Sequence, residues 1–349
     1  MPPCVFKASL GRDPRRWRYR AAMERRPLGR SGLWVGRLGL GTGTWTRGTD
    51  EYEARDQLAA FLDAGGSLID TADVYADGDS EALLGELLEE FEVRDEVVLS
   101  TKAGAVDGAD RRTNTSRLHL LRALDRSLRR LRTETIDLWQ LHAWDPWTPM
   151  DETLAAVDDA VRSGKVRYVG ISNYSGWQMA RAATWQQAVP GRASLVTAQM
   201  EYSLLERGVE REVVPAAQAV GMGLLPWSPL GRGVLTGKYR HTMPIDSRGA
   251  NVDTAGWVQV YLDERGRRIV DALATAAEGL GASPTEVALA WLRDRPGVVA
   301  PILGARTNIQ LIAALASEEL ELPEEIITAL DDVSAPAMGY PESGWAQRR

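Results

Sequence analysis

The sequence predicts an α/β protein with the (β/α)8 barrel (TIM barrel) fold. Eight short apolar segments alternate with amphipathic segments along the 349 residues, a pattern typical of parallel strands that are buried on both faces and joined by helices. The repeats follow one another without a linker rich in proline or serine. Eight repeats favour a closed barrel over an open, doubly wound sheet.

The individual elements follow from turn residues and periodicity. Residues 27–37, with a turn at Ser31-Gly32, predict an N-terminal β-hairpin ahead of the barrel. Apolar runs predict strands at 38–41, 67–71, 96–101, 136–141, 166–171, 195–199, 223–227 and 298–303. Apolar residues at helical spacing predict helices at 51–64, 80–90, 116–131, 151–163, 176–187, 209–220 and 308–316. Two extra helices are expected at 261–279 and 283–294, after a segment of little periodicity at 228–256.

The N-terminus differs from the rest of the chain. Residues 12–20 are strongly basic and show no core periodicity, and no apolar stretch of a secretory signal follows them. We expect a disordered N-terminal extension over residues 1–24 and a single barrel domain with a C-terminal tail over 25–349. Met23, just before the ordered pattern begins, is a second candidate translation start.

Composition excludes several classes of function. The formal charge of −7, from 48 acidic and 41 basic residues, argues against a nucleic-acid partner, which requires a basic face. One cysteine and three histidines argue against a disulfide framework and a metal centre. No apolar run approaches the roughly 20 residues of a membrane span, so we expect a cytoplasmic protein without a membrane partner. A homo-oligomer is compatible with the sequence.

Four ionisable residues follow consecutive predicted strands. Asp70 ends the second strand and Tyr75 lies in the loop after it, while Lys102 and His142 follow the third and fourth strands. Taken singly, each has an ordinary structural explanation, such as a turn aspartate, a packed tyrosine, a solvated lysine or a structural histidine. In a (β/α)8 barrel, however, active sites form at the C-terminal ends of the strands, and the coincidence of all four indicates such a site.

The four side chains have a shared chemical logic. A phenol has a pKa near ~10 in water, too high for an efficient proton donor at neutral pH. A nearby ammonium lowers that pKa, and a buried ammonium needs a carboxylate partner. Lys102 and Asp70 can meet these needs for Tyr75, and the imidazole of His142 can orient a carbonyl oxygen. The set predicts proton delivery to an oxygen atom while a hydride reaches the carbon.

From about residue 25 to residue 340 the chain resembles the aldo-keto reductase superfamily. The motifs that carry the resemblance are GLGTGTW at 39–45, DTADVY at 70–75, GISN at 170–173, WSPL at 227–230 and GKY at 237–239. The resemblance implies a catalytic tetrad in which Tyr75 is the general acid and Lys102 modulates its pKa. In that tetrad Asp70 pairs with the lysine and His142 orients the substrate. The branch with the most similar motifs includes bacterial reductases and potassium-channel β subunits.

The cofactor site is expected in the last loops of the barrel. Two glycine-rich stretches, at 39–44 and 231–237, lack the glycine spacing of a dinucleotide-binding βαβ unit. Barrels instead hold phosphates in the loops after strands seven and eight, here at 228–231 and 304–306. The second of these loops precedes a helix N-terminus, which favours anions. The resemblance implies NADPH as the cofactor.

The resemblance also assigns the cofactor contacts. Ser172, Asn173 and Gln199 would hydrogen-bond the nicotinamide carboxamide, and Trp227 would stack on its ring. The phosphates would be surrounded by Ser228, Leu230, Lys238 and Arg248, and the adenosine 2′-phosphate would meet Arg306 beside Gln310. The expected set is completed by Thr44, Trp45, Asp70, Pro229 and Gly304. Ala313 and Ala314 replace a Glu-Asn pair of related members, whose asparagine helps to hold the adenine.

The expected substrate is a small-molecule aldehyde or ketone, reduced to an alcohol. Its site would be lined by Trp45, Tyr75, His142 and Trp144, with Tyr202 also at the mouth. Aromatic walls favour an apolar or planar carbonyl compound. Two other functions are compatible with the sequence. One is a cofactor-sensing regulatory subunit of the channel-β type, against which the retained histidine argues. The other is a barrel lyase or isomerase that uses the same lysine, against which the nicotinamide motifs argue.

Overall fold

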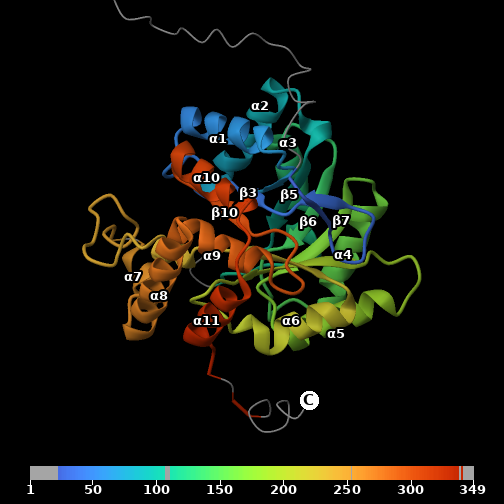
Figure 1. Ribbon diagram of the computed structural model, residues 1–349. Coiled ribbons are helices and arrows are strands. Elements are labelled where there is room, and N and C mark those ends of the chain that lie inside the picture. Colours follow the sequence, from blue (N-terminus) through green and yellow to red (C-terminus); the bar gives the residue numbers. More distant parts are fainter. Residues whose placement is uncertain (1–22, 107–110, 253, 338, 341–349) are drawn as a thin grey trace, which may run out of the picture.

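Eight parallel strands form the central sheet, in the order β10-β3-β4-β5-β6-β7-β8-β9, and helices lie around it (Figure 1). The computed structural model describes residues 23–106, 111–252, 254–337 and 339–340. The strands are β3 (Gly39–Gly41), β4 (Leu68–Asp70), β5 (Val98–Ala103), β6 (Ile136–Leu141), β7 (Val166–Ser172), β8 (Leu195–Glu201), β9 (Gly223–Trp227) and β10 (Ile302–Gly304). Neighbouring strands in this order pair in parallel, as the predicted fold requires.

Backbone hydrogen bonds close the sheet between its first and last strands. Leu224 on β9 donates its N–H to the carbonyl of Gly297 at 2.9 Å and accepts the N–H of Val299 at 2.9 Å. These bonds join β9 to the segment that leads into β10. The predicted (β/α)8 barrel is therefore confirmed.

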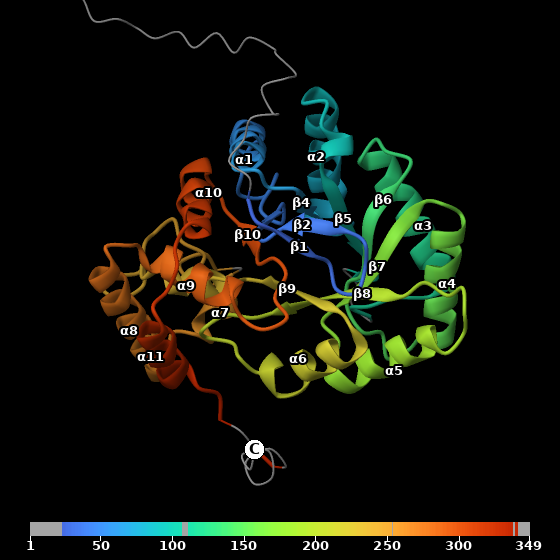
Figure 2. The same ribbon diagram turned by 45° about the vertical axis from the view of Figure 1, so that its right-hand side comes forward.

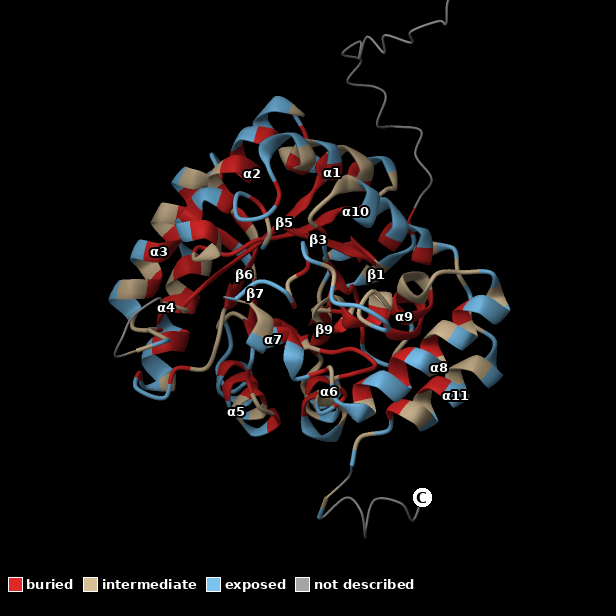
Figure 3. Ribbon diagram, turned by 90° about the vertical axis from the view of Figure 1, so that its left-hand side faces the viewer, coloured by how far each residue is buried: buried red, intermediate tan, exposed pale blue. Residues whose placement is uncertain are grey.

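Helices surround the strands on the outside (Figure 2). The connecting helices are α1 (Glu51–Asp63), α2 (Asp79–Glu90), α3 (Arg117–Arg130), α4 (Met150–Arg162), α5 (Gly176–Gln187), α6 (Val209–Val220) and α10 (Asn308–Leu315). Between β9 and β10 lie α7 (Ala255–Gln259), α8 (Glu264–Leu280) and α9 (Pro284–Arg293), and α11 (Glu324–Ser334) follows α10. Burial is concentrated in the strands and on the inward helix faces (Figure 3), as expected for helices with one apolar stripe.

The N-terminal hairpin closes one end of the barrel. Strand β1 (Arg25–Pro27) pairs antiparallel with β2 (Trp34–Gly36). Leu28 and Val35 of this hairpin have no exposed surface and form one apolar cluster with Leu68, Val98 and Leu138 from the strands. Because this cluster fills the N-terminal end, ligands can reach the interior only from the C-terminal ends of the strands.

Side-chain alternation places the polar groups above that apolar layer. Successive residues of a strand point to opposite faces, so Val98, Ser100 and Lys102 of β5 share the inner face. On β4, Leu68 and Asp70 are related in the same way. The register pairs Asp70 with Ser100, which brings the two polar positions to one level. The sequence therefore builds an apolar floor with ionisable groups above it.

The predicted strands and connecting helices are present, with shifted ends and two omissions. The eighth strand, expected at 298–303, begins only at Ile302, because Pro301 has no N–H for the ladder. The helices α7 and α11 were not predicted. Residues 1–22 of the expected N-terminal extension lie outside the described residues, and Met23 is buried against the core.

Candidate active site

The centre of the site is a buried ion pair between neighbouring strands. The ammonium Nζ of Lys102 on β5 lies 2.6 Å from Oδ2 of Asp70 at the end of β4, and both side chains are almost completely buried. Nζ also donates to the carbonyl of Thr71 at 2.7 Å. Burial lowers the pKa of Lys102, but the charge interactions and hydrogen bonds with Asp70 and Tyr75 together outweigh it, and the pKa is raised. The lysine is therefore charged at neutral pH.

Three further donors hold the carboxylate of Asp70. Its Oδ1 accepts hydrogen bonds from Ser100 Oγ at 2.9 Å, Gln140 Nε2 at 3.3 Å and Gln199 Nε2 at 3.0 Å. These side chains come from β5, β6 and β8, and all are buried. A buried charge is stable only when its hydrogen-bonding capacity is met. The inner layer of the barrel thus fixes Asp70 beneath the lysine.

Tyr75 reaches the same ammonium from the loop after β4. Its phenolic oxygen lies 3.4 Å from Lys102 Nζ, at the long end of a hydrogen bond. Burial raises the pKa of Tyr75, and attraction to Lys102 only partly opposes the rise. The lowering influence of Lys102 that the sequence analysis expected is present, but the cost of burying a phenolate outweighs it.

His142 completes the group at the end of β6. Its ring meets the ring of Tyr75 edge to face, with centroids 6.0 Å apart. Burial and the nearby Lys102 ammonium lower the pKa of His142 to about 3, so the imidazole is neutral at physiological pH. A neutral imidazole still carries one N–H donor, which can orient a carbonyl oxygen. The structure therefore brings together all four residues of the predicted tetrad.

The predicted nicotinamide contacts lie at the ends of β7, β8 and β9. Asn173 donates to the backbone oxygen of His142 at 2.9 Å and to Ser172 Oγ at 3.1 Å, and it accepts the indole N–H of Trp227 at 3.0 Å. Both amide hydrogens of Asn173 are therefore engaged within the protein. Trp227 lies parallel to Trp257 of α7, with ring centroids 6.5 Å apart.

The loop after β9 has features of an anion site. Ser228, Gly231, Arg232, Gly233 and Gly237 have left-handed backbone conformations, with φ between 49° and 94°. Such turns can gather successive backbone N–H groups into one concavity. A Cβ on Gly233 would lie 3.3 Å from Lys238 Nζ, so the glycine leaves room for this ammonium against the loop. Pro229 is buried beside it and Leu230 packs against the core.

Two arginines beyond this loop, Arg248 and Arg306, lie close enough to repel each other. Burial and repulsion from Arg306 lower the pKa of Arg248. Arg306 donates to the backbone oxygen of Asp246 at 2.6 Å, while the carboxylate of Asp246 lies 4.0 Å away. Two guanidinium groups that repel each other are stabilised when a phosphate binds between or beside them. The donor set therefore fits the phosphates of the expected dinucleotide.

The remaining expected cofactor residues surround the end of β10. Thr44 Oγ1 donates to the backbone oxygen of Ala305 at 2.7 Å, which ties the loop after β3 to the loop after β10. Gln310 accepts the N–H of Arg306 at 3.0 Å, and Gly304 is exposed. Helix α10 follows this loop and carries Ala313, which is exposed, and Ala314, which is buried.

Two of the expected aromatic residues do not line an open mouth. Trp45 has no exposed surface, and its indole donates to the buried Gln57 at 3.0 Å. Tyr202 is also buried, and its hydroxyl donates to Glu210 at 2.7 Å. Both face the packed interior because a polar acceptor there satisfies the ring's donor. Placing these two rings at the mouth is therefore wrong for this structure.

Trp144 belongs to a different aromatic group at the rim. Its ring meets Tyr174 and Trp177 edge to face, with centroids 5.2 Å and 5.6 Å away. Trp177 is 57% exposed. Sequence reasoning did not single out Trp177, although its place just after the predicted nicotinamide motif was a usable signal. Exposed aromatic side chains on this rim offer an apolar wall for a substrate.

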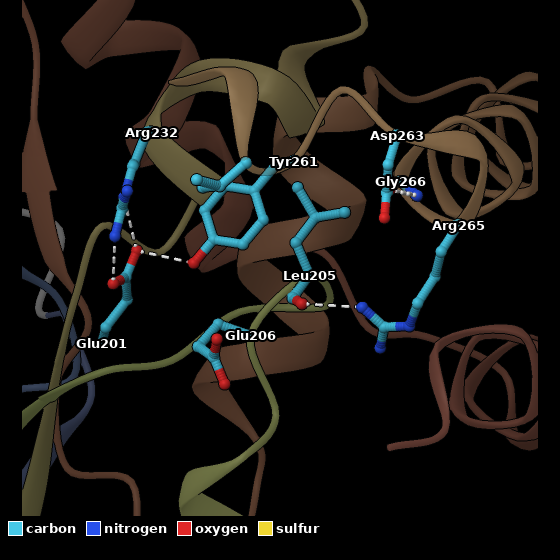
Figure 4. Close-up of a pocket in the computed structure, with 9 residues that line it drawn as sticks. Glu201, Leu205, Glu206, Arg232, Tyr261, Asp263, Arg265 and Gly266 are labelled. Carbon is cyan, nitrogen blue, oxygen red and sulfur yellow. Dashed lines mark hydrogen bonds and ion pairs between the residues drawn. The ribbon is translucent and has the colours of Figure 1, made fainter. Parts of the chain in front are cut away.

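A cavity of about 380 Å³ lies between the end of β8, the loop after β9 and the start of α8 (Figure 4). Arg232 and Glu201 form a close ion pair across it, at 2.6 Å, and the hydroxyl of Tyr261 donates to the same carboxylate at 2.9 Å. Arg265 donates to the backbone oxygen of Leu205 at 3.0 Å. These contacts brace the loop after β9, and no tetrad residue lines the cavity.

The described parts of the chain contain few other groups suited to chemistry. No group of three or more histidine, cysteine, aspartate or glutamate side chains there could hold a metal ion. Within the same residues, no helix combines the length and apolarity needed to cross a bilayer. Asp73 is an additional buried carboxyl, without a partner for Oδ1, whose pKa is raised to about 7 by burial and by Glu81.

Comparison with known proteins agrees with this geometry. The model of the aldo/keto reductase family matches residues 37–335. The chain is 37% identical over 322 residues to the uncharacterized oxidoreductase YrpG of Bacillus subtilis (strain 168), covering 89% of this chain and 96% of that protein. It is 34% identical to a putative voltage-gated potassium channel subunit beta of Schizosaccharomyces pombe, covering 88% and 92%. It is 33% identical to the aldo-keto reductase YhdN of Bacillus subtilis, covering 83% and 87%.

The matched region contains the whole barrel and every tetrad residue, and the two Bacillus relatives are named as an oxidoreductase and an aldo-keto reductase. The family resemblance inferred from the motifs is thus confirmed, and the family generally uses a nicotinamide cofactor. This chain belongs to the aldo/keto reductase family.

Proposed function

We propose that the protein reduces an aldehyde or ketone to an alcohol with NADPH as the cofactor. One observation carries the proposal: a charged lysine lies between a carboxylate at 2.6 Å and a phenolic oxygen at 3.4 Å. Lys102, Asp70 and Tyr75 form this arrangement at the open end of the barrel. It suits protonation of an oxygen atom and contains no nucleophile–base pair for acyl transfer.

Tyr75 acts as the general acid. Its raised pKa keeps the phenol protonated at neutral pH, and release of the proton therefore depends on stabilisation of the phenolate that forms. Once it has given its proton to the carbonyl oxygen, the phenolate is stabilised by the Lys102 ammonium. Asp70 keeps that ammonium charged, and solvent restores the phenol proton.

His142 orients the substrate as a neutral hydrogen-bond donor. Its pKa of about 3 leaves it neutral, so its N–H can donate to the carbonyl oxygen in the ground state and as charge develops there. The rim around Trp144 and Trp177 supplies apolar contact for the rest of the molecule. These roles predict a planar or apolar carbonyl substrate.

The loops after β9 and β10 would hold the cofactor. When bound, NADPH supplies the hydride that reduces the carbonyl carbon. Lys238, Arg248 and Arg306 bind its phosphates, and Trp227 presents a flat surface for the nicotinamide ring. A 2′-phosphate adds a dianion that a guanidinium recognises well, which favours NADPH over NADH.

The test mixes the protein with NADPH and 4-nitrobenzaldehyde and follows the loss of reduced-cofactor absorbance. Tyr75→Phe removes the proton donor and little else, so turnover should fall by about 10²–10⁴-fold while NADPH binding persists. Tyr52→Phe, at a position that is 78% exposed, is the matched control and should keep full activity. Persistent turnover in Tyr75→Phe would contradict the mechanism.

A regulatory subunit that senses the cofactor is the second candidate. Among the relatives, proteins named as voltage-gated potassium channel subunits beta share 34% identity with this chain over nearly their whole length. The same assay separates the two proposals. NADPH binding without turnover across a panel of aldehydes and ketones would favour the sensor, and turnover that depends on Tyr75 would favour the reductase.

A further inference from the structure

The loop that carries Tyr75 has an unfavourable backbone. Directly after the tyrosine, Ala76 has φ 48°, Asp77 has φ 57° and Gly78 has φ 100°. Residues other than glycine rarely adopt this left-handed region, and they stay there only when surrounding contacts enforce it. The position of the phenol therefore depends on whatever holds this loop from outside.

Arg130, the last residue of α3, makes those contacts. Its guanidinium donates to the backbone oxygen of Asp73 at 3.1 Å and to the backbone oxygen of Asp77 at 3.1 Å. These two carbonyls lie on either side of Tyr75, two residues away in each direction. One planar, rigid donor group thus bridges both shoulders of the loop, which a single-point ammonium cannot do.

Gly78 shows that the loop is shaped around the guanidinium. A Cβ at this position would lie 2.0 Å from Cζ of Arg130, which is far shorter than any contact between two non-bonded carbon atoms. The glycine is thus needed twice, once for its positive φ and once for the approach of the arginine. The close fit shows that the loop conformation and the position of the Arg130 side chain depend on each other.

Glu81 connects this clamp to the strand of the catalytic lysine. Its carboxylate has no exposed surface. One oxygen pairs with Arg130 at 3.2 Å, and the other accepts the hydroxyl of Thr101 at 2.7 Å. Thr101 directly precedes Lys102 on β5. A continuous chain of side chains therefore runs from the lysine-bearing strand to the tyrosine-bearing loop.

We propose that Arg130 is a positioning residue that, anchored by Glu81, sets the distance between the Tyr75 hydroxyl and Lys102. The proposal rests on the proposed function of Tyr75 as the proton donor. The contact it controls is 3.4 Å long, so a small outward movement of the loop breaks it. Arg130 touches neither the tyrosine hydroxyl nor the lysine, and it acts only through the loop.

The test compares Arg130→Met, which removes the bridge, with Arg130→Lys, which keeps the charge but cannot span both carbonyls and Glu81. Arg130→Met should lower kcat by about 10–100-fold, the effect of a displacement near 1 Å, and leave the KM for NADPH unchanged. The pH profile of kcat should show the pKa of the proton donor moving upward, because the ammonium acts on it from farther away. Arg130→Lys should recover only part of kcat.

Two controls make the outcome decisive. Arg129→Met changes the exposed neighbour on the same helix and should behave as the wild type. Hydrogen exchange of the amides of residues 73–78 should be faster in Arg130→Met than in Arg129→Met, a readout that needs no turnover. Unchanged exchange and kcat in Arg130→Met would overturn the proposal, as would full recovery in Arg130→Lys. If the wild type reduces no carbonyl compound, the proposed function fails, and the exchange rates alone then decide whether the clamp exists.

Discussion

The amide nitrogen of Gln199 donates to Oδ1 of Asp70 across the barrel, at 3.0 Å. Gln199 was expected to contact the nicotinamide, whereas Asp70 neutralises the lysine of the tetrad. The hydrogen bond therefore links the floor of the proposed cofactor site to the counter-ion of Lys102. With one amide hydrogen engaged in this way, Gln199 keeps its amide oxygen and its second N–H for a carboxamide.

Breaking the buried ion pair from one side should destabilise the fold. Asp70→Asn leaves the Lys102 ammonium buried without a carboxylate, which we expect to cost about 3–5 kcal/mol in the free energy of unfolding. Lys102→Met should cost a similar amount. Urea denaturation checks this, and the double variant Asp70→Asn/Lys102→Met should be more stable than either single variant. If the loss of stability in the double variant equals the sum of the losses in the two single variants, the two groups do not interact.

Stability at acid pH should depend on His142. Its folded pKa of about 3 lies below the unfolded value of about 6.5, so the unfolded chain takes up a proton first as pH falls. The folded state is therefore progressively disfavoured from about pH 6.5 downward, by about 2 kcal/mol at pH 5. His142→Gln should remove this share of the decline between pH 8 and pH 5. Identical pH profiles in the two proteins would contradict the burial of a neutral imidazole.

Asp73 should act in the opposite direction. Its folded pKa is raised to about 7, above the unfolded value of about 3.9, so the folded state binds the extra proton. Stability from this group is complete below about pH 4 and is lost as pH rises through 7. Asp73→Asn, which cannot ionise, should cancel about 2–3 kcal/mol of the decline between pH 5 and pH 8. Thermal melts at both pH values would show whether that decline survives in the variant.

Cofactor preference should depend on Arg306. Arg306→Ala removes the guanidinium proposed to meet the 2′-phosphate, and the loss of a charge-assisted hydrogen bond should raise the KM for NADPH about 10–100-fold. The KM for NADH should stay nearly unchanged, because NADH has no phosphate at that position. Initial rates with both cofactors measure the effect, and equal changes for the two would refute the assignment.

The sequence predicted what depends on strand order and alternation. Asp70, Lys102 and His142 follow consecutive strands, and parallel strands bring such positions to one end of a barrel, so the tetrad could be assembled without coordinates. Helix α11 was missed although Ile326, Ile327 and Leu330 have helical spacing after Pro323. A closer count of that periodicity would have found it.

What the sequence missed depends on burial and on contacts between distant residues. The pKa of Tyr75 rises because the phenol loses water, which no spacing rule reports. Trp45 turned inward because Gln57, on the next helix, offers a buried acceptor for its indole. Arg130 and Gly78 are far apart in the chain, and only the packing of α3 on the loop joins them.

The hairpin β1–β2 determines the route by which ligands enter and leave the barrel. A barrel that is closed at its N-terminal end has one opening, and the dinucleotide and the carbonyl compound would both have to enter and leave through it. The dinucleotide, placed by the proposal against the tetrad, must then bind before the carbonyl compound and leave after the alcohol. The kinetics should therefore be compulsory-ordered, with release of the oxidised dinucleotide as the last step of each cycle.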